Sequence, residues 1–173
     1  DIRTFDFGSL PEKYKIVANI PYYLTSHLIR SVSETANSPE LAVLLVQKEV
    51  AQRLAAQPGQ MSILAVTAQF YFECSLDIEV PAHYFTPPPK VDSAVIKLTP
   101  WKQKPYQAID EKLLAQVVTQ AFSQRRKTLR NTLKKMIDAT ELIALDIDPT
   151  ARAETLSVEQ FVRISNKLYE LSV

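Results

Sequence analysis

Short apolar runs alternate with helix-like patterns through the first half of the chain. Residues 14–18 and 41–46 are mostly apolar, which is typical of strands buried in a sheet. After each run the apolar positions recur at helical spacing, and Thr25 can serve as the N-cap of the first helix. The predicted helices cover about 25–33, 48–56 and 61–69. Strands that alternate with helices predict an α/β fold with a parallel sheet covered on both faces.

The pattern changes to strict alternation at 72–80, where every second residue is apolar. This predicts a strand with one exposed face. Residues 91–99 (VDSAVIKLT) predict a further strand, so the segment PAHYFTPPPK between the two should join neighbouring strands at the sheet edge. The three successive prolines, Pro87–Pro89, hold that segment extended and stiff.

The strand signal ends after Pro100, and helical patterns follow. Asp110 can cap a helix whose apolar positions run from Leu113 to Phe122. A second helix is predicted by the apolar residues Leu129, Leu133, Met136 and Ile137.

The last helix is predicted by a capping box. Ser157 and Gln160 have the required spacing, and apolar residues follow at helical spacing from Phe161 to Leu171. We therefore expect a boundary near 100–108, with an incomplete α/β domain before it and a small helical domain after it.

Composition excludes several classes of protein. With 173 residues, 46% of them hydrophobic, the chain can bury a core. One Cys rules out an internal disulfide, and two His form no cluster suited to a metal, so we expect no metal site. The only glycines are Gly8 and Gly59, so the chain contains no Gly-rich phosphate loop. Neither a membrane span nor a signal peptide is evident, so we expect a cytoplasmic protein without membrane contact.

The net charge of +1 hides an uneven distribution. Residues 1–101 hold eight Lys/Arg and ten Asp/Glu, 102–135 hold nine and two, and 136–173 hold three and seven. A basic block of this kind predicts a polyanionic partner.

The turn Asn-Ile-Pro-Tyr-Tyr follows the first predicted strand. The amine of adenine is a poor nucleophile because its lone pair is delocalised into the ring. If the Asn19 side-chain oxygen and the Ile20 carbonyl accept from the two N–H bonds of this amine, they can favour its pyramidal form, in which the lone pair is available. Pro21 restrains Ile20 to an extended conformation, and Tyr22 can stack on the base. By itself such a turn more often ends a strand with two core aromatics.

This turn resembles the N-[IL]-P-[YF] motif of the rRNA adenine dimethyltransferases. The likeness continues, in the order of that family, through four further segments. They are VLLVQKEVAQRL (43–54), FTPPPKVDSAVIKL (85–98), FSQRRKTLRNTLKK (122–135) and RAETLSVEQF (152–161). Together they resemble the bacterial small-subunit branch of the family.

The resemblance implies an α/β fold class in two domains. Residues 1–104 would be the C-terminal part of a Rossmann-like methyltransferase domain and 105–173 a small all-helical rRNA-binding domain. It also implies S-adenosylmethionine as cofactor and, as substrate, two adjacent adenines near the 3′ end of small-subunit rRNA, in the immature small ribosomal subunit.

The resemblance assigns roles to individual residues. Asn19, Ile20, Pro21 and Tyr22 would form the catalytic motif. Tyr22 and Phe85 would stack on opposite faces of the target base. Asp1 and Asn19 would contact the cofactor.

The basic block supplies the expected RNA contacts. Arg126, Arg130 and Lys134 are spaced for one face of a helix, and Arg125, Lys127 and Lys135 lie beside them in the sequence. Such a face suits rRNA phosphates, with binding that weakens steeply as salt increases.

The Gly-rich cofactor loop of the family lies upstream of the matching segments, and the chain begins with Asp rather than Met. We therefore expect a fragment that is inactive alone and whose partial sheet self-associates through an apolar edge. The alternative is a non-catalytic RNA-binding or ribosome-assembly module that uses only the basic residues. A large-subunit rRNA methylase is a third interpretation, which the segments 85–95 and 125–131 argue against. The oligomeric state stays open.

Overall fold

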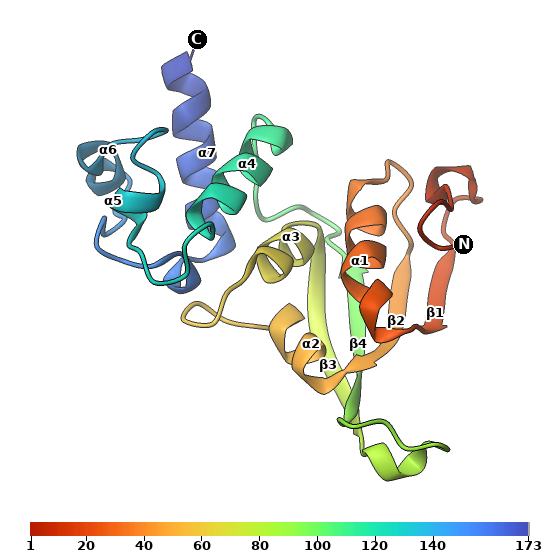
Figure 1. Ribbon diagram of the computed structural model, residues 1–173. Helices are drawn as coiled ribbons and strands as arrows, with labels where there is room; N and C mark the ends of the chain where they lie inside the picture. Colours follow the sequence, from red (N-terminus) through yellow and green to blue (C-terminus); the bar gives the residue numbers. More distant parts are fainter. Residues whose placement is uncertain (173) are drawn as a thin grey trace. The chain divides into compact units, whose positions relative to one another are not determined.

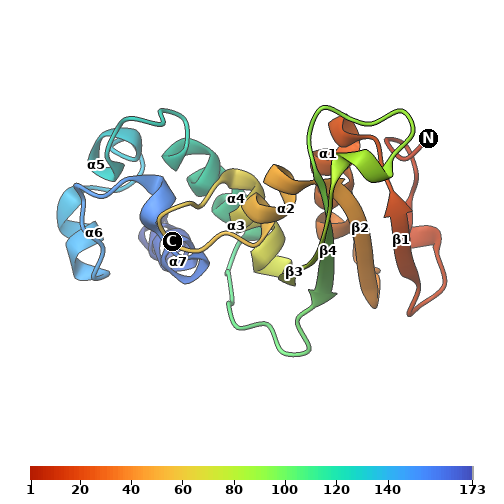
Figure 2. The same cartoon turned by 90° about the horizontal axis from the view of Figure 1, so that it is seen from below.

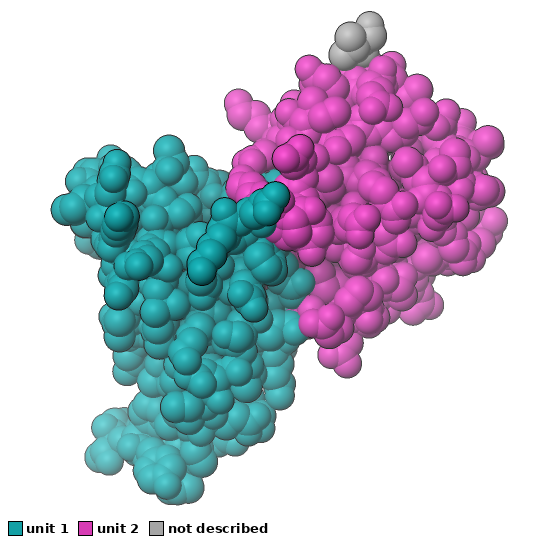
Figure 3. Space-filling view, turned by 180° about the vertical axis from the view of Figure 1, so that it is seen from behind, with its two compact units in different colours: residues 1–55, 67–103 teal, residues 56–66, 104–173 magenta. Residues whose placement is uncertain are grey.

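The computed structural model describes residues 1–172, apart from the side chain of Tyr22. The chain forms two compact units, which are coloured separately in Figure 3. Unit 1 comprises Asp1–Ala55 and Thr67–Gln103, and unit 2 comprises Ala56–Val66 and Lys104–Val173. Residues 56–66, which the sequence places in the α/β domain, thus group with the helical unit.

Unit 1 is built on a four-stranded sheet in the order β1-β2-β4-β3 (Figure 1). Its strands are β1 (Lys15–Asn19), β2 (Leu41–Gln47), β3 (Phe72–Val80) and β4 (Ser93–Pro100). β1 and β2 are parallel, whereas β4 runs antiparallel to both β2 and β3. The prediction that β3 and β4 are neighbours at the sheet edge is confirmed.

The parallel pairing predicted from the first two strands is confirmed for β1 and β2, but it does not extend to β3 and β4. The loop that joins β3 to β4 contains only one short 3-10 turn, η3 (Ala82–Tyr84), in place of a crossover helix. A direct connection of this kind returns the chain antiparallel, because parallel neighbours need a longer crossover.

Helices cover one face of the sheet. The helices α1 (Thr25–Glu34) and α2 (Lys48–Leu54) lie on the same side of the strands in Figures 1 and 2. The residues that fill this core and are fully buried include Leu28, Ile29, Val32, Leu44, Leu54, Ile96 and Leu98. Burial of this many large apolar side chains stabilises the unit, since each contributes about 1.5–3 kcal/mol.

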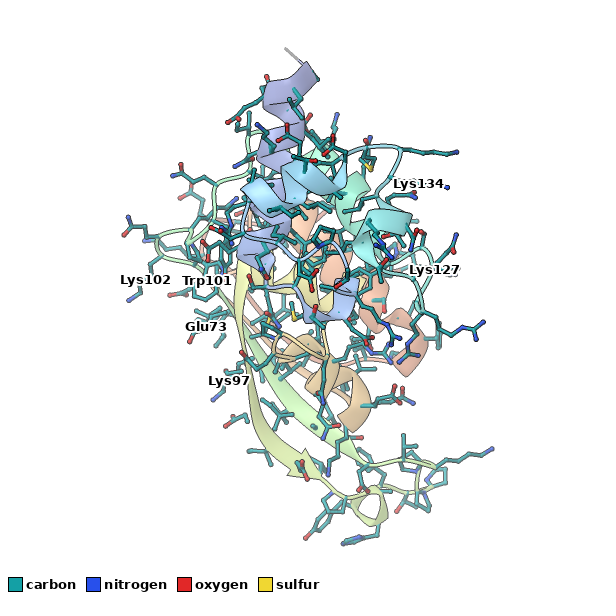
Figure 4. The ribbon with its side chains drawn as sticks, turned by 90° about the vertical axis from the view of Figure 1, so that its left-hand side faces the viewer. Glu73, Lys97, Trp101, Lys102, Lys127 and Lys134 are labelled. Atoms are coloured by element: carbon teal, nitrogen blue, oxygen red, sulfur yellow. The ribbon has the colours of Figure 1, made fainter. Side chains whose placement is uncertain are left out.

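The opposite face of the sheet is open in the described part of unit 1. Val17 on β1 is 81% exposed, and Glu73 and Lys97 project from this face in Figure 4. The predictions of a sheet covered on both faces and of a buried strand at 14–18 were therefore wrong. β1 pairs only with β2 among the described residues, so it is an edge strand with helices on one side alone.

The predicted N-cap at Thr25 was also wrong. A 3-10 turn, η2 (Tyr22–Leu24), runs directly into α1, and Leu24 already has helical backbone angles. The Leu24 N–H donates to the Pro21 carbonyl at 2.9 Å, so the helix begins without an extended capping residue. The Thr25 hydroxyl is instead buried without a hydrogen-bond partner in the described structure.

Unit 2 is helical. Its elements include α4 (Glu111–Ala121), α5 (Leu129–Thr132), α6 (Ala139–Ala144), the 3-10 turn η4 (Ala153–Thr155) and α7 (Val158–Ser172). Both predicted caps are confirmed. The Asp110 carboxylate accepts from the N–H groups of Lys112 and Leu113, and Ser157 and Gln160 form the reciprocal pair of a capping box ahead of α7.

The predicted helix through residues 129–137 reduces to the single turn α5. The Leu129 and Arg130 N–H groups donate to the carbonyls of Ala151 and Pro149, and the Gln120 side chain donates to the Thr132 carbonyl. The first turn of a helix leaves its N–H groups without internal partners, so these remote carbonyls satisfy the start of α5, and the Gln120 amide satisfies the Thr132 carbonyl at its end. Arg126, Arg130 and Lys134 therefore do not share one helix face, contrary to the prediction.

The stretch Ala56–Val66 belongs to unit 2 and includes the connection from α2 and the first turn of α3 (Ile63–Tyr71). The N–H groups of Gly59 and Met61 both donate to the Glu154 carbonyl, at 2.8 and 3.1 Å. Gly59 has a φ of 107°, a region that glycine tolerates and other residues rarely adopt. The remaining short element is η1 (Phe7–Ser9) in unit 1.

Candidate nucleobase site and basic segment

A pocket of about 350 Å³ opens at the carboxyl end of β1. It is lined by Asn19, Ile20, Pro21, Phe85, Pro87 and Pro89. β1 ends at Asn19, so the Asn-Ile-Pro turn leaves the sheet at this point and meets the loop that connects β3 to β4. The structure thus brings together two segments that are far apart in the sequence.

The loop holds Phe85 in place through backbone contacts. The Phe85 N–H donates to the Ala82 carbonyl at 3.1 Å, and the Ala82 N–H donates to the Asp92 carboxylate at 2.9 Å. Two of the three successive prolines line the pocket, and the Thr86–Pro87 peptide is cis. Phe85 is partly buried, with its neighbours Pro87 and Pro89 in the same wall.

The pocket presents unpaired hydrogen-bond acceptors. Asn19 is exposed, and its carboxamide forms no hydrogen bond with the described residues. Ile20 is 6% exposed, and no described backbone N–H donates to its carbonyl, whereas the Pro21 carbonyl is occupied by the Leu24 N–H. The Asn19 Oδ1 atom and the Ile20 carbonyl oxygen are thus available as acceptors to a ligand with two N–H donors.

Two other predicted site residues, Tyr22 and Asp1, are not among the described residues that line the pocket. The Tyr22 side chain is outside the described structure, so its predicted stacking stays a prediction. Asp1 does not line the pocket, and its carboxylate accepts from the backbone N–H and the guanidinium of Arg3, with an Nε to Oδ1 distance of 3.0 Å. A contact between Asp1 and a cofactor would require this pair to open.

The predicted RNA-binding residues form an exposed basic segment in unit 2. Its members are Arg125, Arg126, Lys127, Arg130, Lys134 and Lys135, and all six are exposed. None of them forms an ion pair within the described structure, and Figure 4 shows Lys127 and Lys134 on the outside of the unit. Free cations of this density suit a polyanion.

One carboxylate lies close to this segment. Hydrogen bonds from the Thr150 N–H and hydroxyl lower the pKa of Asp148, with a smaller contribution from the charge of Arg130. Asp148 therefore stays ionised and orders the turn that carries Thr150, while Arg130 remains exposed.

Cys74 lies on β3 and is partly buried. Burial raises the pKa of its thiol to about 12, with a smaller contribution from the charge of Glu73. The thiol is therefore protonated at neutral pH, which disfavours nucleophilic chemistry.

No group of three His, Cys, Asp or Glu side chains that could hold a metal occurs among the described residues. None of the helices in the described part of the chain is both long and apolar enough to span a membrane.

The sequence motifs did not predict a second pocket, which lies at the carboxyl end of β2. Its lining includes Gln47, Gln52 and Lys90. A signal was present, because a polar residue ends each of the two parallel strands, Asn19 on β1 and Gln47 on β2. Ligands in open α/β sheets bind outside the carboxyl ends of the strands.

The sheet order and the pocket beyond β1 define an α/β protein with a Rossmann-like methyltransferase fold. The chain belongs to the ribosomal RNA adenine dimethylase family, whose sequence model matches residues 1–170. This confirms both the fold class and the family that the sequence motifs predicted.

Similar curated proteins include two named "Ribosomal RNA small subunit methyltransferase A". The protein from Proteus mirabilis is 42% identical over 174 residues, covering 97% of this chain and 64% of the relative. The protein from Gloeobacter violaceus is 48% identical over 175 residues, covering 94% of this chain and 63% of the relative. The chain thus spans somewhat less than two thirds of the length of these relatives.

Solved structures show the same fold. A dimethyladenosine transferase from Plasmodium falciparum matches with a TM-score of 0.80 and 24% identity, over 95% of this chain and 70% of that one. The 23S rRNA methyltransferase ErmE matches with a TM-score of 0.76 and 24% identity, over 98% and 70% of the two chains.

Proposed function

We propose that the chain acts in the S-adenosylmethionine-dependent dimethylation of two adjacent adenines near the 3′ end of small-subunit rRNA. The observation that carries the proposal is the pocket in which Asn19, Ile20, Pro21 and Phe85 meet. The names of the curated relatives support the same reaction class.

The pocket suits an adenine that has left its stack. The Asn19 amide oxygen and the Ile20 carbonyl accept from the two N–H bonds of the adenine amine, which favours the pyramidal form with an available lone pair. Phe85 stacks on the ring and offsets part of the cost of unstacking, since such stacking contributes about 1–3 kcal/mol. A singly methylated amine still offers one N–H bond, so the site accepts the substrate of a second transfer.

The methyl donor is held by groups that the pocket does not supply. S-adenosylmethionine would provide a methyl group made electrophilic by its sulfonium. Of the two residues expected to contact it, Asn19 lines the pocket, whereas Asp1 does not and pairs with Arg3. The described residues thus account for binding of the base and not of the donor.

The basic segment of unit 2 would hold the RNA backbone. None of its six exposed cations forms an ion pair within the described structure, so each can contact a phosphate without first breaking one. Sequence-independent phosphate contacts of this kind position the RNA and supply affinity.

The test of the base site is a nucleoside series measured by NMR titration. Adenosine should bind about tenfold more tightly than N6,N6-dimethyladenosine, because the latter lacks both N–H donors. Asn19→Ala should reduce this preference to about threefold, because one of the two acceptors is lost while the Ile20 carbonyl remains. Asn131→Ala, an exposed asparagine of unit 2, is the control and should keep the preference.

Equal affinity for the two nucleosides in the unsubstituted chain would contradict the base site. It would leave a non-catalytic RNA-binding module as the better description. That module also predicts RNA binding by the basic segment, so only the nucleoside series separates the two functions.

The RNA contact is tested with a hairpin from the 3′ end of small-subunit rRNA. Arg126→Gln with Arg130→Gln should weaken binding and reduce the slope of log K against log salt by about two. Lys112→Gln removes an exposed cation of the same unit outside the basic segment and should change the slope by less. An unchanged slope in the double variant would contradict the assignment of the basic segment.

A further inference from the structure

A second pocket of about 420 Å³ lies at the carboxyl end of β2. Its volume is within the range of about 300–1,000 Å³ that is usual for small-molecule sites. The residues that line it include Gln47, Lys48, Gln52, Lys90 and Asp92. None of them was given a role in the base site.

The two pockets are neighbours along one edge of the sheet. β1 and β2 are parallel, with Asn19 paired to Leu45, so Gln47 lies two residues further along the adjacent strand. Adjacent strands are only about 4.8 Å apart. The loop between β3 and β4 lines both pockets, with Phe85, Pro87 and Pro89 in the first and Lys90 and Asp92 in the second.

Hydrogen bonds hold the wall of the second pocket in place. The Lys48 N–H donates to the Asp92 carbonyl at 3.0 Å, and the Asp92 carboxylate accepts from the Ala82 N–H at 2.9 Å. The Lys48 ammonium pairs with Glu79 at 2.7 Å. The pocket is therefore ordered before any ligand enters, which lowers the entropic cost of binding.

The lining holds two cations, Lys48 and Lys90, and two carboxylates, Glu49 and Asp92, so its charges balance. The hydrogen bond that the Lys48 ammonium donates to the Glu79 carboxylate raises the pKa of Lys48, and the charges of Glu79 and Asp92 add to this effect. Lys90 is exposed and forms no ion pair in the described structure. The Gln47 and Gln52 amides offer both donors and acceptors, which suits a neutral polar ring better than an isolated anion.

We infer that the second pocket takes the base and ribose of a nucleotide adjacent to the adenine held by Asn19 and Phe85, with Lys90 contacting the phosphate between them. Adenine fits the amides of Gln47 and Gln52, since glutamine pairs with the ring nitrogen and amine of adenine. The inference rests on the proposed function and extends it from a single base to a dinucleotide.

The test compares adenosine with the dinucleotide ApA by NMR titration of the isotopically labelled chain. ApA should bind about tenfold more tightly than adenosine, because it adds a charge-assisted contact and amide hydrogen bonds. In the double variant Gln52→Ala/Lys90→Ala the ratio of the two affinities should fall to about one. The matched control is Lys112→Ala/Gln116→Ala, which removes the same side-chain types from exposed positions on α4 and should keep the ratio.

The outcomes test the second pocket and the proposed function separately. A ratio near one in the unsubstituted chain, or a ratio that survives in Gln52→Ala/Lys90→Ala, overturns the second pocket while adenosine binding at Asn19 still stands. Inorganic phosphate that binds as tightly as ApA overturns the assignment of base and ribose. Failure of both adenosine and ApA to shift the signals of either pocket overturns the proposed function itself.

Discussion

At the scale of single residues, solvent exposure separates side chains that react or bind from those that only pack. Asn19 ends a strand, stays exposed and keeps its amide unpaired among the described residues, so it is free to bind a ligand. Cys74 lies within β3, where its neighbours bury the thiol and keep it protonated at neutral pH.

The Cys74 thiol should make stability depend on pH. An unfolded thiol ionises near pH 8.5, whereas the folded thiol has a pKa of about 12. Above pH 8.5 the unfolded state therefore releases a proton that the folded state keeps, so the free energy of unfolding falls as pH rises. Urea denaturation between pH 7 and 10 should show a steeper decline for this chain than for Cys74→Ala. Parallel declines in the two proteins would contradict the raised pKa.

At the scale of elements, helix ends follow local chemistry, whereas helix lengths depend on tertiary partners. The capping box of α7 and the Asp110 cap of α4 form as their sequences predict. α5 is a single turn of four residues, whose Leu129 and Arg130 N–H groups and Thr132 carbonyl bond to partners remote in the chain. The spacing of Leu129 and Leu133 was consistent with a longer helix, and both side chains are fully buried without one.

Loss of the capping box should destabilise unit 2. Ser157→Ala removes the acceptor of the Gln160 N–H, and such N-cap changes cost about 1 kcal/mol. Thermal and urea unfolding give the change in the free energy of unfolding. Thr119→Ala, at an exposed position inside α4, is the control and should be neutral or slightly stabilising because Ala favours helix. A Ser157→Ala protein as stable as the unsubstituted chain would show that the box contributes nothing.

At the scale of the whole molecule, the basic segment and the exposed edge strand belong to different units. The basic segment of unit 2 is exposed and forms no ion pair among the described residues. In unit 1, Val17 is exposed on β1, which has a neighbouring strand on one side only in the described sheet. An edge strand of this kind presents backbone groups and apolar side chains that another copy can pair with.

Val17→Lys should reduce self-association. A charged side chain on an edge strand opposes pairing, and the 81% exposure of Val17 means that little packing is lost. Sedimentation velocity over a range of concentrations should show association for the unsubstituted chain and for Val17→Ile, but less for Val17→Lys. An unsubstituted chain that stays monomeric at every concentration would contradict this expectation.

Much of the candidate site was predictable from short segments. The Asn19–Pro21 turn and Phe85 were both identified as parts of one base site, and the structure brings them to one pocket. The second pocket was not anticipated, because Gln47, Gln52 and Lys90 share no motif and meet only when the loop between β3 and β4 folds against the end of β2.

The sequence by itself determined the family, the caps of α4 and α7 and the position of the Asn-Ile-Pro turn after a strand, because these depend on residues within a few positions of one another. Only the tertiary structure decided that β4 runs antiparallel between β2 and β3 and that one face of the sheet is open. It also decided that the basic residues lie on the short helix α5 and the turns around it rather than on one long helix. These features depend on partners remote in the chain, and hydrogen bonds and burial supplied by remote partners outweigh the small local preferences of each segment.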